Sequence, residues 1–344
     1  MKVAKFVGVG VGIVVLAVII GVVLVKVKFN KTMSKSWEIE VAQIEVPFPL
    51  TEEEVDALRE EELARQTALA LAYGKAIPDD FDPLSEIDLD KVALERAVAR
   101  GEHYMNSRAA CTHCHGEDLG GKMVADAMPV FRMICPNITT GTGSVVSTYT
   151  TDDWVRIIRH GVNQDKHASP MPSLDYTWFS DQEVSDLIAY IQSQPPVDRT
   201  MDPAEVGFIG KMLIAQGKIP ISAELIDHQA ARLKYPPEEQ PTADFGKHLV
   251  QVCTGCHGQN LSGGPILGGD PNWPQAPNLT KHPSGLGDWG YEDFEKAMRT
   301  TIRPDGTLIG EPFPAAYTKN LSDIELLALW KYIESVPAVE MGER

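Results

Sequence analysis

The sequence is poor in positive charge: it has 31 Lys and Arg against 48 Asp and Glu, so its formal net charge is −17 at pH 7. Proteins bind nucleic acids through Lys and Arg side chains that neutralise phosphates, and this balance therefore argues against a nucleic acid partner. The sequence also lacks low-complexity runs, although it contains 28 Gly and 24 Pro. Hydrophobic residues make up 43% of the 344 residues. We therefore expect most of the chain to fold, as two domains with connecting segments.

Charged residues are absent from one segment near the N-terminus, between Phe6 and Val25. A helix of about 20 apolar residues crosses the hydrocarbon core of a bilayer. A cleaved signal peptide is the alternative, but its hydrophobic region is normally only about 7–15 residues long. No small-x-small cleavage site precedes Lys26 and Lys28. We expect residues 1–29 to form an uncleaved transmembrane anchor.

Residues 30–92 are expected to form a linker that contains an acidic helix. Thr51 and Glu54 have the spacing of a capping box and precede a run of helix-forming residues. Two interpretations stay open: a spacer or docking element between the membrane and the rest of the molecule, or a solvated helix packed on the first domain. The Pro-rich, acidic stretch "PDDFDPLSEIDLD" follows and indicates a domain boundary.

Only five cysteines are present, and four of them form two C-x-x-C-H motifs, "CTHCH" and "CTGCH". This pattern is typical of covalent haem attachment, in which two thiols add to the porphyrin and the adjacent His binds the iron. A thioredoxin-type redox motif would leave the His unexplained, and a zinc site would need further ligands nearby. The sequence therefore predicts two covalently attached c-type haems. The attachment residues and His ligands are Cys111, Cys114 and His115 in the first motif, and Cys253, Cys256 and His257 in the second.

The predicted haems also orient the predicted anchor. Lysines flank the apolar segment on both sides, so the positive-inside rule alone does not decide its orientation. Haem of this type is attached outside the cytoplasm. We therefore expect a single-pass protein of the inner membrane, with its N-terminus inside and its haem domains on the periplasmic or extracytoplasmic side.

The two motifs belong to an internal repeat. Cys111 pairs with Cys253 at an offset of 142 (253 − 111), and "PNIT" at Pro136 pairs with "PNLT" at Pro277 at 141 (277 − 136). We expect two copies of one domain, at 93–199 and 241–344, and a connector at 200–240 that packs between them. Each copy should end in a helix with a capping box and an apolar stripe. The capping pairs are Ser180 with Glu183 and Ser322 with Glu325, and the stripes are Val184, Leu187, Ile188 and Ile191, and Leu326, Leu329, Trp330 and Ile333.

On these motifs, the chain resembles a membrane-anchored dihaem c-type cytochrome with two tandem class I-like cytochrome c domains. The resemblance implies an all-α fold of small helical shells around covalent haem, and electron transfer instead of substrate turnover. It implies that the carbonyls of Pro136 and Pro277 accept hydrogen bonds from the ligating imidazoles. For two of the residues that could contact the haem propionates, Arg159 and Arg299, a surface salt bridge is the alternative role. The candidates for contact with the haem propionates are Asn137, Asn278, Arg159 and Arg299.

The resemblance also places the sixth ligand of the first iron at Met171, ahead of His160 and His167 as weaker rivals. A thioether ligand raises the reduction potential of a haem. In the second copy, Phe313 stands at this position (313 − 171 = 142), and phenylalanine cannot bind iron. Three outcomes stay open: an open sixth site, recruitment of another side chain, or a slipped local alignment. The candidates for recruitment are Met298 and His282, ahead of His248 and Met341.

The expected function is outer-sphere electron transfer between membrane-associated redox partners: a quinol-oxidising complex, an oxidase, a reaction centre or a dehydrogenase. One alternative is a haem enzyme of the dihaem peroxidase type that uses an open site at Phe313, although Glu311 is the nearest carboxylate and no acid–base pair is identifiable. The other is a fixed electron-transfer subunit of a larger respiratory or photosynthetic complex. The fifth cysteine, Cys135, is interpreted as a small buried residue, because Ala276 holds its place in the second copy.

Overall fold

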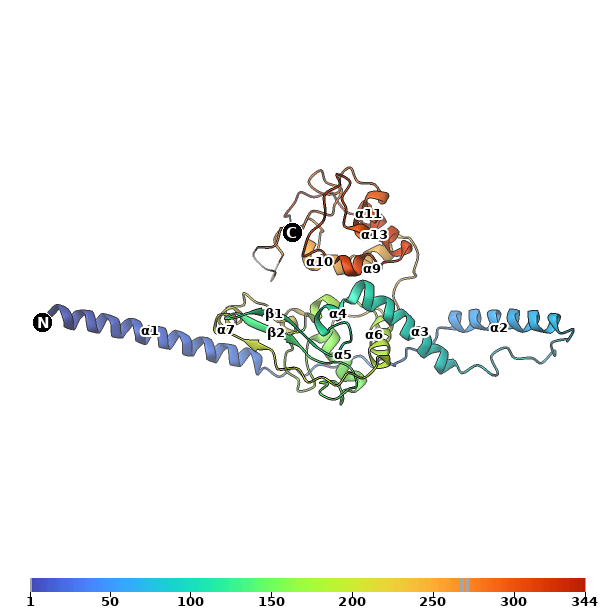
Figure 1. Cartoon of the computed structure of the whole chain (residues 1–344), viewed down its shortest axis with the longest axis horizontal. Helices are drawn as coiled ribbons and strands as arrows, with labels where there is room; N and C mark the ends of the chain where they lie inside the picture. The colour runs from blue at the N-terminus through green and yellow to red at the C-terminus, as the bar shows by residue number, and fades with distance from the viewer. Residues whose placement is uncertain (1, 267–268, 270–271, 344) are drawn as a thin grey trace.

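The computed structural model describes residues 2–266, 269 and 272–343, with side chains from residue 16 onward. A long helix, α1 (Lys2–Met33), leaves the first domain at one end, and a second helix, α2 (Glu52–Ala72), projects at the opposite end (Figure 1). In the described part of the chain, no helix is both long and apolar enough to cross a membrane. The side chains of residues 6–15, which belong to the predicted span Phe6–Val25, lie outside that part.

Helix α2 begins where the capping box predicted. The Glu54 backbone N–H donates to the Thr51 hydroxyl at 3.1 Å, and the Thr51 N–H donates to the Glu54 carboxylate at 2.8 Å. Arg100 of the first domain also donates to Glu54, at 3.2 Å. None of the residues that the structure describes in α2 is buried. The first turn of α2 is therefore tied to the first domain, while the rest of the helix is solvated.

The first domain is built on the crossing of α3 (Leu89–Tyr104) with α6 (Asp181–Ser193). Gly101 lies at the crossing, where a Cβ atom would overlap the backbone carbonyl of Asp186. The predicted capping box of Ser180 and Glu183 opens α6. The predicted stripe is confirmed, since its four residues are at most 4% exposed. The other helical segments are the π-helical turn η1 (Met105–Ala109), α4 (Cys111–His115), α5 (Thr151–His160) and the 3₁₀ turn η2 (Ser173–Tyr176).

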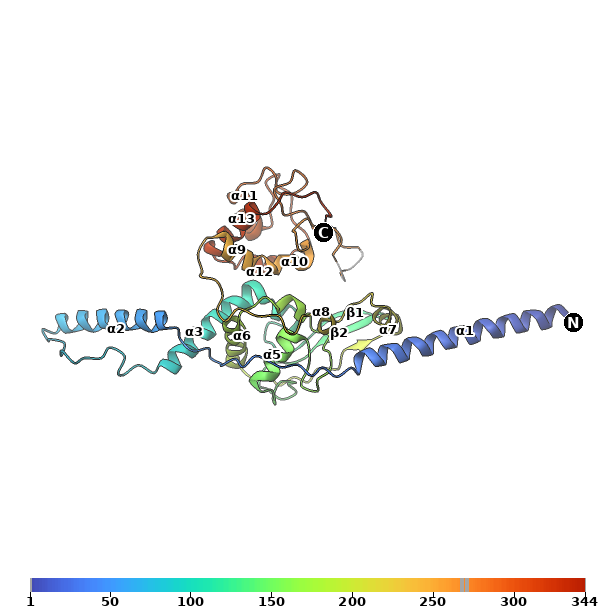
Figure 2. The ribbon, with the colours of Figure 1, turned by 180° about the vertical axis from the view of Figure 1, so that it is seen from behind.

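The second domain repeats this arrangement. Helix α9 (Ala243–Leu249) crosses α13 (Asp323–Ser335), and a Cβ atom at Gly246 would overlap the carbonyl of Ala328. The capping box of Ser322 and Glu325 opens α13, and its apolar stripe is buried as predicted. In both views this domain lies on one side of the first domain (Figures 1 and 2), and Figure 1 shows α4 on that side. The remaining helices are α10 (Gln251–His257), α11 (Tyr291–Thr300) and α12 (Ala315–Thr318).

The prediction of an all-α fold is wrong in one respect, because the mostly helical chain also contains a small antiparallel sheet. Strands β1 (Lys122–Ala127) and β2 (Phe131–Cys135) form a hairpin, with Lys122 opposite Cys135 and Ala127 opposite Phe131. The short strand β3 (Glu205–Val206) then pairs with β2. This last pairing joins segments some 70 residues apart (205 − 132 = 73), and local sequence patterns do not encode it.

The connector follows the surface of the first domain instead of packing between the two domains. Its helix α7 (Phe208–Ala215) packs on α1, and α8 (Ser222–Leu225) packs near η2. Further along, the imidazoles of His160 and His228 approach to 3.0 Å, and the Leu233 carbonyl accepts a hydrogen bond from Asp181. The expected position was wrong because the apolar residues of the connector find partners in α1 and in the first domain.

Candidate cofactor sites

Each attachment helix presents its histidine in the same way. Helix α4 ends at His115, whose Nδ1 lies 2.8 Å from the carbonyl of Pro136, and α10 ends at His257, whose Nδ1 lies 2.8 Å from the carbonyl of Pro277. A carbonyl only accepts hydrogen bonds, so Nδ1 must carry the proton in both rings. Nε2 then carries the lone pair that a metal requires. Burial also lowers the pKa of His115, which favours the neutral ring.

The loops that follow the two histidines have matching backbones. Gly116 and Gly258, which end the attachment helices, have φ angles of 83° and 79°. In the first domain Ile138 N–H donates to the Leu119 carbonyl at 2.9 Å, and in the second Leu279 N–H donates to Leu261 at 2.8 Å. The repeat seen in the sequence is therefore a repeat of three-dimensional structure around both sites.

The first thiol of each motif is buried, and burial raises the pKa of Cys111 and of Cys253 to about 12. Two cysteines one helical turn apart, with a neighbouring imidazole whose lone pair is on Nε2, form the donor set that holds a c-type haem. Among the described residues, no group of three or more His, Cys, Asp or Glu side chains could hold a metal ion by itself. The zinc alternative therefore finds no support there.

Cys135 has a position that the sequence analysis missed. It is half-buried and its thiol is hydrogen bonded to Cys114, an interaction that lowers the pKa of Cys114 to about 7 and raises that of Cys135. The hairpin brings the end of β2 beside α4. In the sequence, Cys135 stands directly before Pro136, whose carbonyl contacts His115. This position was the signal that could have placed Cys135 beside the attachment motif.

Phe313 occupies the same backbone position in the second domain as Met171 in the first. Ser173 N–H donates to the Met171 carbonyl at 2.8 Å, and Ala315 N–H donates to the Phe313 carbonyl at 2.9 Å. The intervening prolines agree as well, with φ/ψ of −76°/57° at Pro172, just before η2, and −82°/55° at Pro314, just before α12. A slipped alignment is therefore not supported here. Met171 packs partly buried against the core of the first domain.

The rival ligands have other contacts. Met298 packs against the core of the second domain, and the His282 Nδ1 lies 2.8 Å from the Ser284 hydroxyl within the loop that follows Pro277. Burial lowers the pKa of His160 to about 4. His167 contacts the Lys35 carbonyl at 3.3 Å.

The propionate candidates all bind protein groups. Arg159 pairs with Asp181 at 2.6 Å, and Arg299 pairs with Asp323, so each arginine joins the third helix of its domain to the start of the terminal helix. The side-chain amide of Asn137 donates to Val197 at 2.6 Å, and that of Asn278 donates to Val339 at 2.7 Å. These contacts hold the last segment of each domain beside its histidine-supporting loop. Contact with propionates stays a prediction.

The two attachment helices also face the opposite domain, which the sequence did not indicate. Thr112, between the two cysteines of α4, is hydrogen bonded to Tyr317 of α12 at 3.0 Å. Asp175 of η2 lies against Gly255 of α10, where a Cβ atom would be 3.6 Å from the Asp175 carboxylate.

Comparison with known proteins agrees with the geometry. Residues 96–191 match the family model described as cytochrome c oxidase, cbb3-type, subunit III, and residues 243–337 match the model described as cytochrome c. The chain is 26% identical over 268 residues to the fructose dehydrogenase cytochrome subunit of Gluconobacter japonicus, covering 72% of this chain and 54% of that protein. It is 27% identical over 277 residues to a diheme cytochrome c-type protein of Cereibacter sphaeroides, covering 72% of this chain and 88% of that protein.

A third relative is the gluconate 2-dehydrogenase cytochrome c subunit of Pantoea cypripedii, 24% identical over 285 residues, with 74% of this chain and 63% of that protein covered. The chain thus spans between about half and two thirds of these two dehydrogenase cytochrome subunits.

Proposed function

Because the chain is a dihaem c-type cytochrome with two covalently bound c-type haems, we propose that it passes electrons from a dehydrogenase to a second membrane-associated redox protein. The observation that carries the proposal is the pair of equivalent sites, each with an oriented histidine and each in contact with the other domain through its attachment helix. Several relatives support it, since they are cytochrome subunits of fructose and gluconate dehydrogenases.

The residues of the chain position and tune the cofactors. When bound, each haem supplies an iron that gains and loses one electron. The Pro136 and Pro277 carbonyls orient the two imidazoles and raise their basicity. Met171 is proposed as a thioether ligand that raises the potential of the first haem, and the asymmetry with Phe313 gives the two haems different potentials. Transfer to and from partners is outer-sphere.

The N-terminal helix is proposed as a membrane anchor, with the N-terminus inside and both haem domains on the periplasmic side. The uncharged segment from Phe6 to Val25 and the extracytoplasmic attachment of c-type haem support this topology. Membrane fractions washed with alkaline carbonate should retain the full-length protein. In intact spheroplasts, external protease should remove both haem domains. Release of the protein by the wash, or protection from the protease, would contradict the anchor or its orientation.

Sizing in mild detergent tests whether the cytochrome is a fixed subunit or a tethered carrier. If it is a dehydrogenase subunit, it co-purifies with a dehydrogenase whose substrate reduces both haems. If it is a tethered carrier, it elutes alone and is reduced only when the dehydrogenase is added. Haems that no dehydrogenase reduces in the native membrane would contradict the proposed function.

Phe313 supports a second candidate, a haem enzyme with an accessible iron in the second domain. An acid–base group beside the iron would be required for peroxide cleavage, and Glu311, the nearest carboxylate in the sequence, is exposed. The fructose and gluconate dehydrogenase relatives named above are cytochrome subunits, which favours electron transfer. Peroxide turnover by the purified protein distinguishes the two candidates.

A further inference from the structure

The two domains contact each other through a pseudo-twofold interface. His103 of α3 and His248 of α9 are equivalent, since they share the offset of Gly101 and Gly246 at the helix crossings (248 − 103 = 145; 246 − 101 = 145). Each imidazole reaches the capping-box glutamate of the opposite domain. His103 Nε2 lies 2.9 Å from Glu325, and His248 Nε2 lies 3.0 Å from Glu183. The interface therefore contains the same contact twice, each time between a helix-crossing histidine of one domain and the capping-box glutamate of the other.

Arg108 breaks this symmetry. The attachment motifs are offset by 142 residues but the helix crossings by 145, so the first domain has three additional residues before its motif (145 − 142). The π-helical turn η1 lies in this stretch and contains Arg108, and such turns are frequent at functional sites. Val250 stands at the place of Arg108 in the second domain (250 − 108 = 142).

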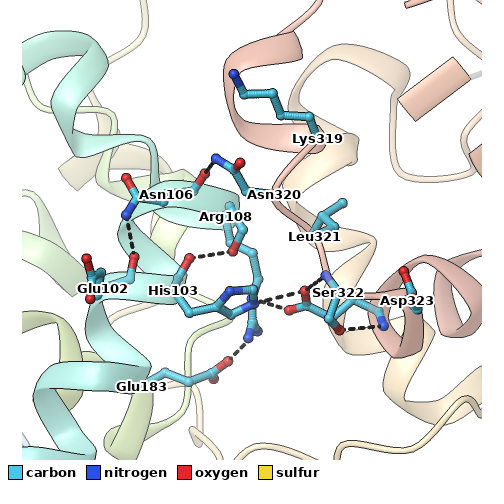
Figure 3. A network of polar contacts seen from close by, with 12 residues as sticks. Glu102, His103, Asn106, Arg108, Glu183, Lys319, Asn320, Leu321, Ser322 and Asp323 are labelled. Carbon is cyan, nitrogen blue, oxygen red and sulfur yellow. Dashed lines mark hydrogen bonds and ion pairs between the residues drawn. The ribbon is translucent and has the colours of Figure 1, made fainter. Parts of the chain in front are cut away.

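Arg108 joins the two equivalent glutamates, and Figure 3 shows its contact with Glu183. Its Nη1 donates to Glu183 at 3.0 Å, and its Nε lies 3.1 Å from a carboxylate oxygen of Glu325. The guanidinium also stacks on the ring of Tyr104, 4.3 Å from its centroid. Arg108 is 6% exposed and both glutamates are fully buried. A planar guanidinium with several donors is well suited to bridging two carboxylates.

The two carboxylates would repel each other without a cation. Each is brought to the interface by its own capping box, in which Glu183 accepts from Ser180 N–H at 2.8 Å and Glu325 accepts from Ser322 N–H at 2.7 Å. Burial acts to raise the pKa of each glutamate, but the facing histidine and Arg108 hold it below its ordinary value. Both carboxylates therefore stay ionised, and removing one partner of a buried charge cluster is strongly unfavourable.

This docking places the turn after each sixth-ligand position on the attachment helix of the other domain. Tyr317, four residues after Phe313, is hydrogen bonded to Thr112 in α4. Asp175, the equivalent residue (317 − 175 = 142), faces Gly255 in α10. Asn320 adds a hydrogen bond to the Asn106 carbonyl at 2.8 Å (Figure 3). A short path of bonds thus runs from the attachment motif of the first haem to the sixth-ligand turn of the second.

We propose that Arg108 is a positioning residue for electron transfer between the two haems: by joining Glu183 to Glu325, it fixes the docking in which Thr112 and Tyr317 touch. The proposal rests on the electron-transfer function. The step moves one electron from ferrous to ferric iron, and neither a proton nor another reactant is consumed.

The test is the rate at which an electron, introduced by flash photoreduction of the full-length holoprotein in detergent, redistributes between the haems. Arg108→Gln should slow redistribution by about tenfold or more, because small misplacements of reacting groups have large effects on rate. The absorption spectrum and potential of each haem should stay unchanged. Arg108→Lys, which keeps the charge but not the planar fork, should give an intermediate rate.

Two further variants separate positioning from general damage. The double variant Arg108→Gln with Glu325→Gln removes one charge of each sign, keeps the capping spacing and should recover most of the rate. Arg199→Gln breaks an exposed ion pair with Asp118 inside the first domain, and should redistribute electrons at the normal rate.

The results that test the role of Arg108 differ from the result that would contradict the proposed electron-transfer function. An unchanged redistribution rate in Arg108→Gln, with both haems intact, overturns the positioning role. A double variant as slow as the single one overturns it as well. If Arg108→Gln does not acquire its haems, the redistribution rates of Arg108→Lys and of the double variant are each compared with that of the unaltered protein, and they decide the question. Haems of the unaltered protein that exchange no electrons at all would contradict the proposed function instead.

Discussion

At the scale of single residues, the two haem sites share their histidine geometry and differ at the position of Met171 and Phe313. The His115 and His257 contacts to proline carbonyls are the same length, and the turns of Met171 and Phe313 have the same backbone. A phenylalanine side chain offers no lone pair to iron. We therefore expect the two haems to differ in their sixth ligand.

Phe313→Met should convert the second haem to His/Met ligation. In the unaltered protein, low-temperature EPR should show a high-spin signal from about half of the ferric haem, which becomes low-spin in the variant because thioether ligation is strong-field. Met298→Leu serves as the matched control and should keep the high-spin signal. Two low-spin haems in the unaltered protein would mean that another side chain binds the iron, and the control then tests Met298 directly.

Tyr317→Phe removes one hydroxyl and keeps the ring. Its hydrogen bond to Thr112 is a direct link between the domains, so the electron redistribution rate should fall roughly two- to fivefold while docking persists, since one neutral hydrogen bond contributes only about 1 kcal/mol. Tyr291→Phe, in α11 of the same domain, is the control. Equal rates in both variants would remove Tyr317 from the path.

At the scale of elements, the close crossing of two helices organises each domain. Gly101 and Gly246 allow α3 and α9 to lie directly on α6 and α13. The histidines two residues further along, His103 and His248, then point from each crossing to the opposite domain. The same element thus builds the core of its own domain and the interface with the other.

Gly246→Ala should destabilise the second domain by about 1–3 kcal/mol, because the new Cβ atom would overlap the Ala328 carbonyl and force the helices apart. Chemical denaturation followed by haem absorbance measures the change. Gly310→Ala is the control, since its Cβ would meet no atom within 4 Å. A loss of stability as large in Gly310→Ala would refute the crossing as the cause.

At the scale of the whole molecule, the buried charge cluster makes docking depend on pH. Glu183 faces Arg108, His248 and Ser180, and Glu325 faces Arg108, His103 and Ser322. Both glutamates have a pKa below the ordinary 4.5. Their contribution to docking is therefore complete above pH 4.5 and is lost as the pH falls through the lower folded-state values.

Small-angle X-ray scattering should accordingly show the domains separating below about pH 4, before the haem absorbance reports unfolding of either domain. The variant Glu183→Gln with Glu325→Gln should lack this acid-dependent step. Separation at the same pH in that variant would assign the transition to other groups.

The local parts of this protein were predictable from sequence. The haem motifs, the capping boxes at Ser180 and Ser322, the apolar stripes and the repeat offset of 142 are all short-range patterns, because attachment chemistry and helix periodicity depend on spacing along the chain. The repeat even identified Phe313 as the odd residue. These features depend on spacing along the chain and not on contacts between distant segments.

Tertiary structure decided the rest. Arg108 and Cys135 carry no recognisable motif, and their partners Glu325 and Cys114 come from the other domain and from helix α4. The pairing of β3 with β2, the course of the connector and the contact of Tyr317 with Thr112 also join residues far apart in the chain. Such contacts depend on how complete domains and strands dock, and hydrophobic periodicity or capping signals within a segment say nothing about which surface it will meet.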